Sequence, residues 1–364
     1  MDIISYDIIN SNKCKQIRKG KRMKQICHNN HFVPRLYLKN WSEDRKRIWR
    51  YRLLVSHKNV PIWDYPSIEN VACQSNLYTY LIEESEIDEI ERWFCNEIET
   101  PFIGVIGKVL DKATLKKEDF EILIRYFAAQ YVRTPARLSK QLKFYKEKLP
   151  TVVENAMTKA VQKLERILDN REPLPRIHYD ESFDLVPAKF VMEKNPKNEK
   201  TILKYDVLLG RGLWLYEIKH VVSETSKVLL NHNWEIVKAA KGVKWSTSDD
   251  PVICLNYNNI DDYDFGGGWN RIGSELILPL TPQYILYTQV GCHEKHPEIQ
   301  EDPCFTYLVQ KFIIEHAYRN IFSTKPFNEI INYRNRTEND ILFKHEAVLC
   351  RNWFEDQNEA EKNL

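Results

Sequence analysis

Residues 87–110 read IDEIERWFCNEIETPFIGVIGKVL, and this stretch indicates that the middle of the chain is helical. Its apolar side chains recur at intervals of three and four residues, which is the period of one face of an α-helix. Acidic side chains crowd the first turns, where they favour the positive end of the helix dipole. Pro101 predicts a kink or a split in this helix. The apolar stripe consists of Ile87, Ile90, Trp93, Phe94, Ile98, Phe102 and Ile106.

A second helix is predicted directly after the first, over LKKEDFEILIRYFAAQYVR at 115–133. Pro135 disfavours helical geometry in the residue before it, so this helix should end near Arg133 or Thr134. The same apolar period predicts three further helices. They run from Ala136 through the 140s, over 152–170 and roughly over 200–231.

Strand signals dominate the second half of the chain, where short runs of β-branched and aromatic residues lie between turn residues. The predicted strands are WEIVKAA at 234–240, VKWSTSD at 243–249, PVICLN at 251–256, ELILPL at 275–280 and QYILYTQV at 283–290. The first two flank a Lys-Gly turn and predict a hairpin. An amphipathic helix is predicted after them, at 307–323.

The N-terminal third carries both kinds of signal. HNNHFVPRLYLKNW at 28–41 predicts a short helix that begins after Pro34, because proline is tolerated in a first helical turn. RKRIWRYRLL at 45–54 alternates in the manner of a strand. Together the patterns predict an α+β fold, with a helical middle region packed against a mixed or antiparallel β-sheet contributed mainly by the second half.

The domain organisation predicted from these patterns has three parts. Residues 1–24 are a basic N-terminal extension that we expect to be poorly ordered, and Met23 is an alternative start that would make residues 1–22 an upstream extension. Residues 25–325 form a single intertwined domain, with a helical lobe at about 85–232 and a β-rich lobe at about 233–325 plus 28–82. Residues 326–364 are a polar C-terminal segment.

Composition narrows the function classes. The net charge of the 364 residues is only +2, which excludes a protein that coats DNA through a global basic field. The basic run between Lys13 and Lys24 is a local candidate for nucleic-acid contact, and a solvated tail is the plainer interpretation. The eight cysteines form no CxxC pair, which favours reduced thiols over disulfides or a zinc site. No signal peptide or bilayer-spanning segment is evident, so we expect a cytoplasmic protein without membrane contact.

Three residue types suit chemistry on a charged substrate. His31 precedes the Pro-started helix and suits proton transfer, or it caps that helix or bonds a neighbouring carbonyl. Arg133 suits a phosphate or carboxylate clamp, or it is a cation at a helix C-terminus. Asp249 or Asp250, in STSDDPV at 246–252, suits orienting His31, acting as a base or binding Mg²⁺, or it forms an Asx-type turn before Pro251.

The chain resembles the bacterial family called domain of unknown function 4238. The resemblance rests on six motifs that occur in the family's order. They are HFVPRLYLKNW at 31–41, NVACQSNLYTY at 70–80, IERWFCNEIE at 90–99, QYVRTPAR at 130–137, STSDDPV at 246–252 and LPLTPQ at 278–283. The asparagine common in the TSD segment of such proteins is Asp250 here. The resemblance implies a cytoplasmic protein of bacteria or mobile elements, of which at least one group is associated with defence against phage.

The leading functional hypothesis is a defence or toxin-like enzyme acting on a phosphate-bearing substrate, which would be RNA, DNA or a nucleotide. His31 would be the acid or base, Arg133 would stabilise charge on phosphate, and Asp249 would orient His31 or hold Mg²⁺. The predicted substrate-binding residues are Tyr37, Gln130, Ser248 and Asp250. The alternative is a non-catalytic sensor or interaction protein in which these polar motifs hold structure. The reaction, metal and oligomeric state stay open at this level.

Overall fold

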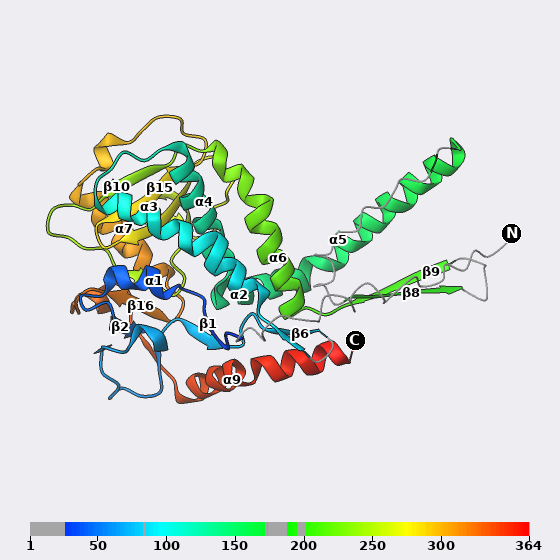
Figure 1. Ribbon diagram of the computed structural model, residues 1–364, viewed down its shortest axis with the longest axis horizontal. Helices are drawn as coiled ribbons and strands as arrows, with labels where there is room; N and C mark the ends of the chain where they lie inside the picture. The colour runs from blue at the N-terminus through cyan, green and yellow to red at the C-terminus, as the bar shows by residue number, and fades with distance from the viewer. Residues whose placement is uncertain (1–25, 83–84, 172, 174–187, 195–200, 364) are drawn as a thin grey trace, which may run out of the picture.

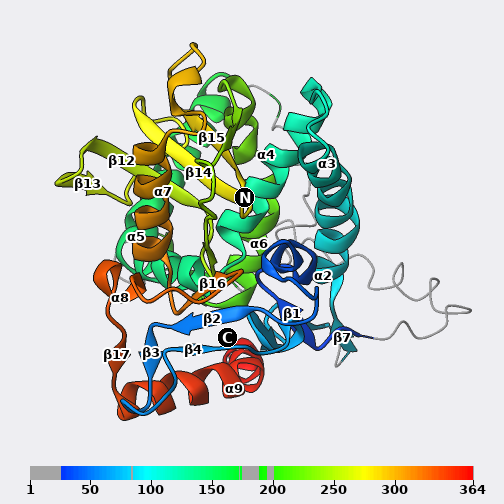
Figure 2. The same cartoon turned by 90° about the vertical axis from the view of Figure 1, so that its left-hand side faces the viewer.

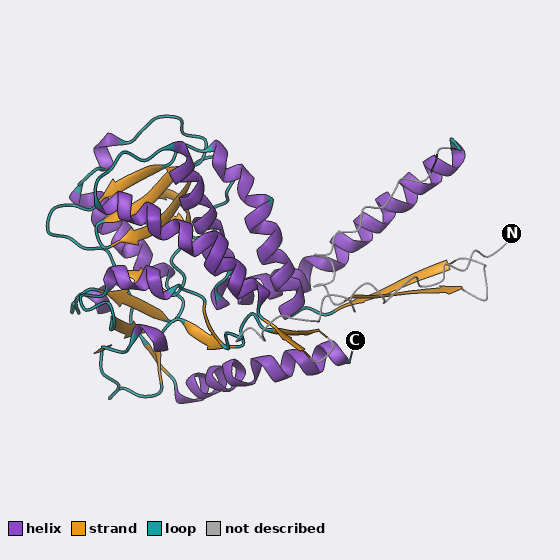
Figure 3. Ribbon diagram, viewed as in Figure 1, coloured by secondary structure: helices purple, strands orange, loops and turns teal. Residues whose placement is uncertain are grey.

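A computed structural model describes residues 26–82, 85–171, 173, 188–194 and 201–363. The predicted basic extension at 1–24 lies outside these residues. Figure 1 shows a body of packed helices and strands from which two arms project, one helical and one a two-stranded hairpin. The fold is α+β, as predicted, and Figure 3 separates its helices from its strands by colour.

The elements have the following bounds. The helices are α1 Arg35–Leu38, α2 Glu89–Trp93, α3 Thr100–Leu110, α4 Lys117–Val132, α5 Pro135–Asp169, α6 Arg211–Ser223, α7 Pro303–His316, α8 Ile330–Tyr333 and α9 Asp340–Lys362, with short helical segments η2 Lys39–Trp41, η3 Ile68–Asn70, η4 Phe94–Glu99, η6 Thr225–Asn231 and η7 Pro297–Ile299. The strands are β1 Asn29–His31, β2 Trp49–Arg52, β3 Leu54–Val55, β4 Trp63–Asp64, β5 Cys73–Ser75, β6 Tyr80–Ile82, β7 Ser85–Ile87, β8 Ala188–Lys194, β9 Thr201–Val207, β10 Glu235–Lys238, β11 Thr247–Ser248, β12 Ile253–Asn259, β13 Asp262–Asp264, β14 Ser274–Thr281, β15 Tyr284–Gln289, β16 Asn320–Ser323 and β17 Thr337–Glu338.

The largest sheet in the described residues is antiparallel, with the strand order β10-β15-β14-β12-β13. Its central strands are buried on both faces, because helices cover each side (Figure 2). Ile277 and Ile285 face α7, where they join Phe312 in one core cluster. Leu276 and Leu286 belong to the larger cluster that includes the apolar face of α4. The alternation of side chains along a strand thus divides the two cores.

A second sheet brings distant motif segments together. Its order is β11-β16-β2-β4, and all three of its pairings are antiparallel. In its register Thr247 lies opposite Phe322, and Phe322 in turn lies opposite Arg50. The short pair β1–β5 places His31 opposite Cys73. Residues more than 200 positions apart therefore share one side of the body.

The two helices predicted in the middle of the chain are confirmed, with one addition. Between α2 and α3 the segment η4 is a π-helix, and Pro101 lies in the first turn of α3, where it is tolerated. Helix α4 ends with Arg133 as its C-cap, two residues before Pro135. Helix α1 begins after Pro34, as expected. The local sequence signals at 28–41 and 87–133 were therefore sufficient to predict the helices in these two segments.

Several predictions of connection and extent were wrong. The two helices expected at 136–170 are one helix, α5, which passes through Pro150. Residues 201–207 form strand β9 instead of helix, because they pair with β8. Strand β10 pairs with β15, and β11 pairs with β16, so the predicted hairpin at 234–249 does not form. The last residues of the helix predicted at 307–323 form β16. In the last three cases, pairing with a partner strand overrides the local preference.

The C-terminal part of the chain, expected to be polar, contains the long helix α9. It packs along β3, β5 and β6 (Figure 1). Among the described residues, no helix combines the length and apolar content that a bilayer crossing requires. The division of residues 25–325 into two lobes stays a prediction.

Candidate functional site

Some of the predicted site residues lie around the turn between α4 and α5, and Arg133 is at its centre. The Arg133 guanidinium is buried, with 1% of the residue exposed. It donates to Glu99 Oε1 at 2.7 Å and to the backbone carbonyl of His31 at 2.5 Å, and it stacks on the Phe94 ring at 4.1 Å. Tyr78 donates its hydroxyl proton to the Arg133 carbonyl. Arg133 thus fastens β1 and the π-helical segment to the end of α4.

His31 lies beside Arg133, but the contact is through its backbone. Its side chain is nearly buried, and Nε2 has no hydrogen-bond partner among the described residues. Burial and the nearby Arg35 lower the pKa of His31, so its neutral form is favoured. Gln130 also attaches α4 to the segment that follows β1, because its Nε2 donates to the Phe32 carbonyl at 2.8 Å.

Asp249 holds the turn between α7 and β16. Its carboxylate accepts hydrogen bonds from the backbone N–H groups of Tyr318 and Arg319 and from Asn320 Nδ2, at 2.9–3.1 Å. Burial raises the pKa of Asp249 to about 6, while these donors oppose the shift. This is the turn-capping role that was the alternative to a catalytic carboxylate.

Asp250 connects the α4–α5 turn to α7. Its Oδ1 accepts a hydrogen bond from Thr134 Oγ1 at 2.9 Å, and its carbonyl bonds His316 Nδ1 at 3.0 Å. Ser248 Oγ accepts from the Asp250 N–H, which shapes the local turn. The carboxylate of Asp250 lies 3.8 Å from His316 Nε2.

Tyr37 fastens α1 to both sheets. Its hydroxyl bonds Thr247 Oγ1 at 2.7 Å and donates to the Pro279 carbonyl at 2.7 Å. The ring is buried against Trp41 and Tyr126.

The structure therefore brings His31, Gln130 and Arg133 together, with Asp250 attached through Thr134, while Tyr37 and Asp249 hold other elements. Sequence reasoning missed two partly buried carboxylates near Arg133, which are Glu91 and Glu99. Glu91 Oε2 has no partner among the described residues, and burial raises the pKa of Glu91 to about 7. Both belong to IERWFCNEIE, so their place in a family motif was the signal that could have found them. Within the described residues, no group of three or more His, Cys, Asp or Glu side chains is placed to hold a metal ion.

A cavity of 580 Å³ opens beside this turn, and we call it the motif pocket. Phe32, Pro135 and Asp249 line one side, together with the β5 residues 73–75. Residues of α9, including Glu346 and Cys350, line the other side. The motif pocket falls within the size range of small-molecule sites, about 300–1,000 Å³.

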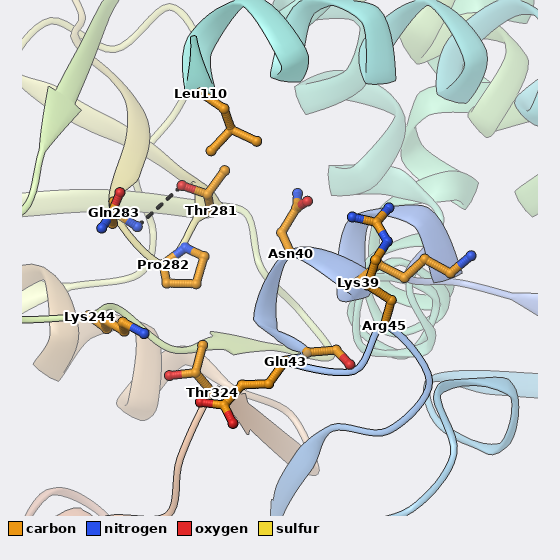
Figure 4. A pocket seen from close by; sticks show the side chains of 11 residues that line it. Lys39, Asn40, Glu43, Arg45, Leu110, Lys244, Thr281, Pro282, Gln283 and Thr324 are labelled. Carbon is orange, nitrogen blue, oxygen red and sulfur yellow. Dashed lines mark hydrogen bonds between the residues drawn. The ribbon is translucent and has the colours of Figure 1, made fainter. Parts of the chain in front are cut away.

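A second cavity, of 430 Å³, is basic, and we call it the basic pocket (Figure 4). Lys39 and Arg45 lie on one side of it and Lys244 on the other. In the described part of the chain, none of these three cations makes an ion pair, and the one acidic lining residue, Glu43, lies 3.9 Å from Lys325. Neutral polar groups complete the wall, among them Asn40, Thr281 and Gln283.

The loop that carries Arg45 is held in a strained form. Arg45 has a φ of 58°, a left-handed value that non-glycine residues seldom adopt. Asp44 Oδ1 stabilises the loop, because it accepts from the N–H groups of Lys46 and Arg47 at 2.8 and 2.7 Å. Such strain is concentrated at functional sites. It fixes the loop on which Arg45 reaches the pocket.

Comparison with known proteins gave one family. The sequence model described as "Protein of unknown function (DUF4238)" matches residues 29–327. That range runs from β1 past β16 and ends before α8 and α9. Searches of curated proteins and of solved structures found no match.

Proposed function

This chain belongs to the DUF4238 family of proteins of unknown function, as its motifs predicted, and we propose that it binds a phosphate-bearing ligand in the basic pocket and acts by recognition. The ligand class is a nucleotide or a nucleic-acid backbone. The role corresponds to the non-catalytic alternative raised by the sequence, with the phosphate chemistry of the leading hypothesis retained.

The observation that carries this proposal is that three cations without an ion-pair partner among the described residues line one cavity. Lys39, Arg45 and Lys244 line a space of 430 Å³ and have no carboxylate partner among the described residues. Cations that repel one another gain most from an anion bound between them, and phosphate oxygens accept several charge-assisted hydrogen bonds at once. Asn40 and Thr281 add neutral polar groups at the same wall.

The position of the basic pocket within the family motifs supports the same interpretation. Lys39 and Asn40 belong to HFVPRLYLKNW, and Thr281 to Gln283 belong to LPLTPQ. Two segments that identify the family thus meet there. Arg45 follows the first of these motifs closely, and Lys244 lies just before a third motif, STSDDPV.

The geometry of the predicted catalytic residues favours recognition over reaction. A general base needs a free lone pair directed at the substrate. Both oxygens of Asp249 already accept N–H donors, and Arg133 is directed at Glu99 and a backbone carbonyl. Catalytic roles for His31, Arg133 and Asp249, a Mg²⁺ cofactor and a place in phage defence stay predictions.

The proposal is tested by measuring the affinity of the full chain for ATP by calorimetry and for a labelled 20-nucleotide single-stranded RNA by anisotropy. The variant Lys39→Gln, Arg45→Gln, Lys244→Gln should lose at least about tenfold in affinity. For the RNA, the slope of log affinity against log salt should become shallower by about 2, because three cations no longer contact phosphates.

The matched control removes three exposed cations from α5, as Lys146→Gln, Lys159→Gln and Lys163→Gln, with the same change in net charge. Its affinity should stay within about twofold of wild type at 0.15 M salt, where surface charges are screened beyond about 8 Å. Equal losses of affinity in both variants would show that binding depends only on net charge and would refute ligand binding in the basic pocket. Ligand turnover with Mg²⁺ that a folded His31→Ala variant lacks would restore the enzyme hypothesis.

A further inference from the structure

Helix α9 lines one side of the motif pocket and lies beyond the residues that the family model matches. Figures 1 and 2 show this helix along the lower edge of the body. It supplies Glu346 and Cys350 to the cavity wall, opposite Phe32 and Cys73. We propose that α9 is a displaceable strap, which closes the motif pocket through two polar clamps and exposes the family-motif wall when the clamps open. This device is separate from the basic pocket.

The contact face of α9 reaches the hydrophobic core at one side chain, Trp353, whose Nε1 also donates to the Leu77 carbonyl at 3.2 Å. None of the residues 340–362 is buried. The half-buried side of the helix mixes apolar and polar groups at helical spacing, and it consists of Phe343, Glu346, Trp353, Phe354, Gln357, Asn358, Ala360 and Glu361. Contacts of this polar kind resemble transient interfaces, which permit relative motion of the packed parts.

The first clamp joins α9 directly to the predicted site. Arg319 Nε donates to Glu346 Oε1 at 3.2 Å and to Oε2 at 2.9 Å, and Nη2 also bonds Glu346. The backbone N–H of the same Arg319 donates to Asp249. Arg319 therefore links the Glu346 clamp directly to the Asp249 carboxylate of the TSD motif.

The second clamp holds the far end of α9. Arg211, at the start of α6, has an exposed fraction of 0%. Its guanidinium bonds Glu361 Oε1 at 3.2 Å and Asn358 Oδ1 at 2.7 Å, and its backbone N–H donates to Gln357 Oε1 at 2.7 Å. Gly210 permits the approach of Gln357, because a Cβ at that position would collide with the Gln357 amide.

The start of α9 is fixed independently of the clamps. Strand β17 runs parallel to β3, and the N–H groups of Thr337 and Asn339 donate to Leu53 and Val55 carbonyls. The Asn339 side chain caps the helix through the Leu342 N–H. If the clamps release, α9 remains tethered at this end and the opposite end swings.

The experiment measures how fast a bulky maleimide alkylates Cys73 in the full chain, with the site mapped by mass spectrometry. The clamp variant Glu346→Gln, Glu361→Gln should raise the Cys73 rate about tenfold, because both ion pairs are lost. Wild type should also react faster at 1 M salt, where ion pairs are screened.

The control variant Glu355→Gln, Glu359→Gln makes the same charge change on exposed positions of α9 and should react at the wild-type rate. Amide hydrogen exchange of the full chain gives a second readout. Exchange across α9 should be faster in the clamp variant than in wild type, while exchange across α4 stays unchanged. An unchanged Cys73 rate in the clamp variant, or faster exchange that extends to α4, would overturn the strap and make α9 an integral part of the body.

Discussion

The buried cation of Arg133 should contribute to the stability of the folded protein. Arg133 connects α4, β1 and the π-helical segment through Glu99 and the His31 carbonyl. Replacing it with methionine removes the cation and leaves Glu99 and Glu91 without it. We expect Arg133→Met to lower the free energy of unfolding by about 3–5 kcal/mol, the usual cost of breaking a buried pair.

Urea denaturation of purified protein measures this effect. Arg125→Met, on the same helix at a half-buried position without an ion pair among the described residues, should cost less than about 1 kcal/mol. A stable Arg133→Met protein that has lost turnover of a phosphate substrate would point instead to catalysis.

Glu91 should make stability depend on pH. Burial raises its pKa to about 7 in the folded chain, against 4.5 for the free side chain. Between these values the folded state holds a proton that the unfolded state has lost, so stability falls as pH rises from 4.5 to 7. Glu91→Gln should match wild type near pH 4 and exceed it by up to about 3 kcal/mol at pH 8.

The measurement is a series of urea unfolding curves from pH 4 to 8. Glu97→Gln, on the same π-helical segment but exposed, serves as the reference and should follow the wild-type profile. If Glu91→Gln also follows the wild-type profile, neighbouring charges offset the cost of burying the ionised Glu91 carboxylate.

At the scale of elements, sequence predicted what local spacing determines and missed what distant pairing determines. The helix at 115–133 follows from its own apolar period and from Pro135, and the structure ends it at Val132. Strand β10 was assigned correctly as a strand, but its partner β15 lies about 50 residues away, and no local signal names it.

The candidate site shows the same limit. The sequence hypothesis joined His31, Arg133 and Asp249 at one site. The structure brings His31, Gln130 and Arg133 together, while Asp249 caps a different turn, so a shared site for the three predicted catalytic residues stays a prediction. The sequence could not show that Arg133 reaches the His31 carbonyl instead of its imidazole, because side-chain direction depends on packing. Lys39 and Lys244 are about 200 residues apart in the sequence and line the same pocket only because of how the chain folds. The sequence therefore carried no signal for the basic pocket.

A single hydroxyl on helix α1 bonds both sheets. Tyr37 bonds both Thr247 of β11 and the Pro279 carbonyl of β14. Tyr37→Phe leaves these buried partners unsatisfied and should lower the free energy of unfolding by about 1–3 kcal/mol. Tyr307→Phe, which changes an exposed tyrosine on α7, should have no measurable effect. Equal stabilities of the two variants in chemical denaturation would show that water replaces the lost hydroxyl.

At the scale of the whole molecule, the body and its arms should differ in stability. The outer part of α5 projects from the body (Figure 1), and no side chain from Lys146 to Arg166 is buried. Pro150 removes one hydrogen bond within this helix. The hairpin β8–β9 has two strands, and isolated helices and two-stranded hairpins are both marginal in water. Cooperative unfolding should therefore reside in the body.

Limited trypsin digestion tests this expectation. Among the described residues, the first cuts should fall between Lys146 and Lys204, because local opening there costs least. The nicked protein should keep a cooperative transition within about 3 °C of the intact chain, since few core contacts are lost. Body sites such as Lys238 and Lys311 provide the internal comparison, as they lie on a sheet and a packed helix. Early cleavage at those sites, or a nicked protein that melts without cooperativity, would show that the arm supports the core.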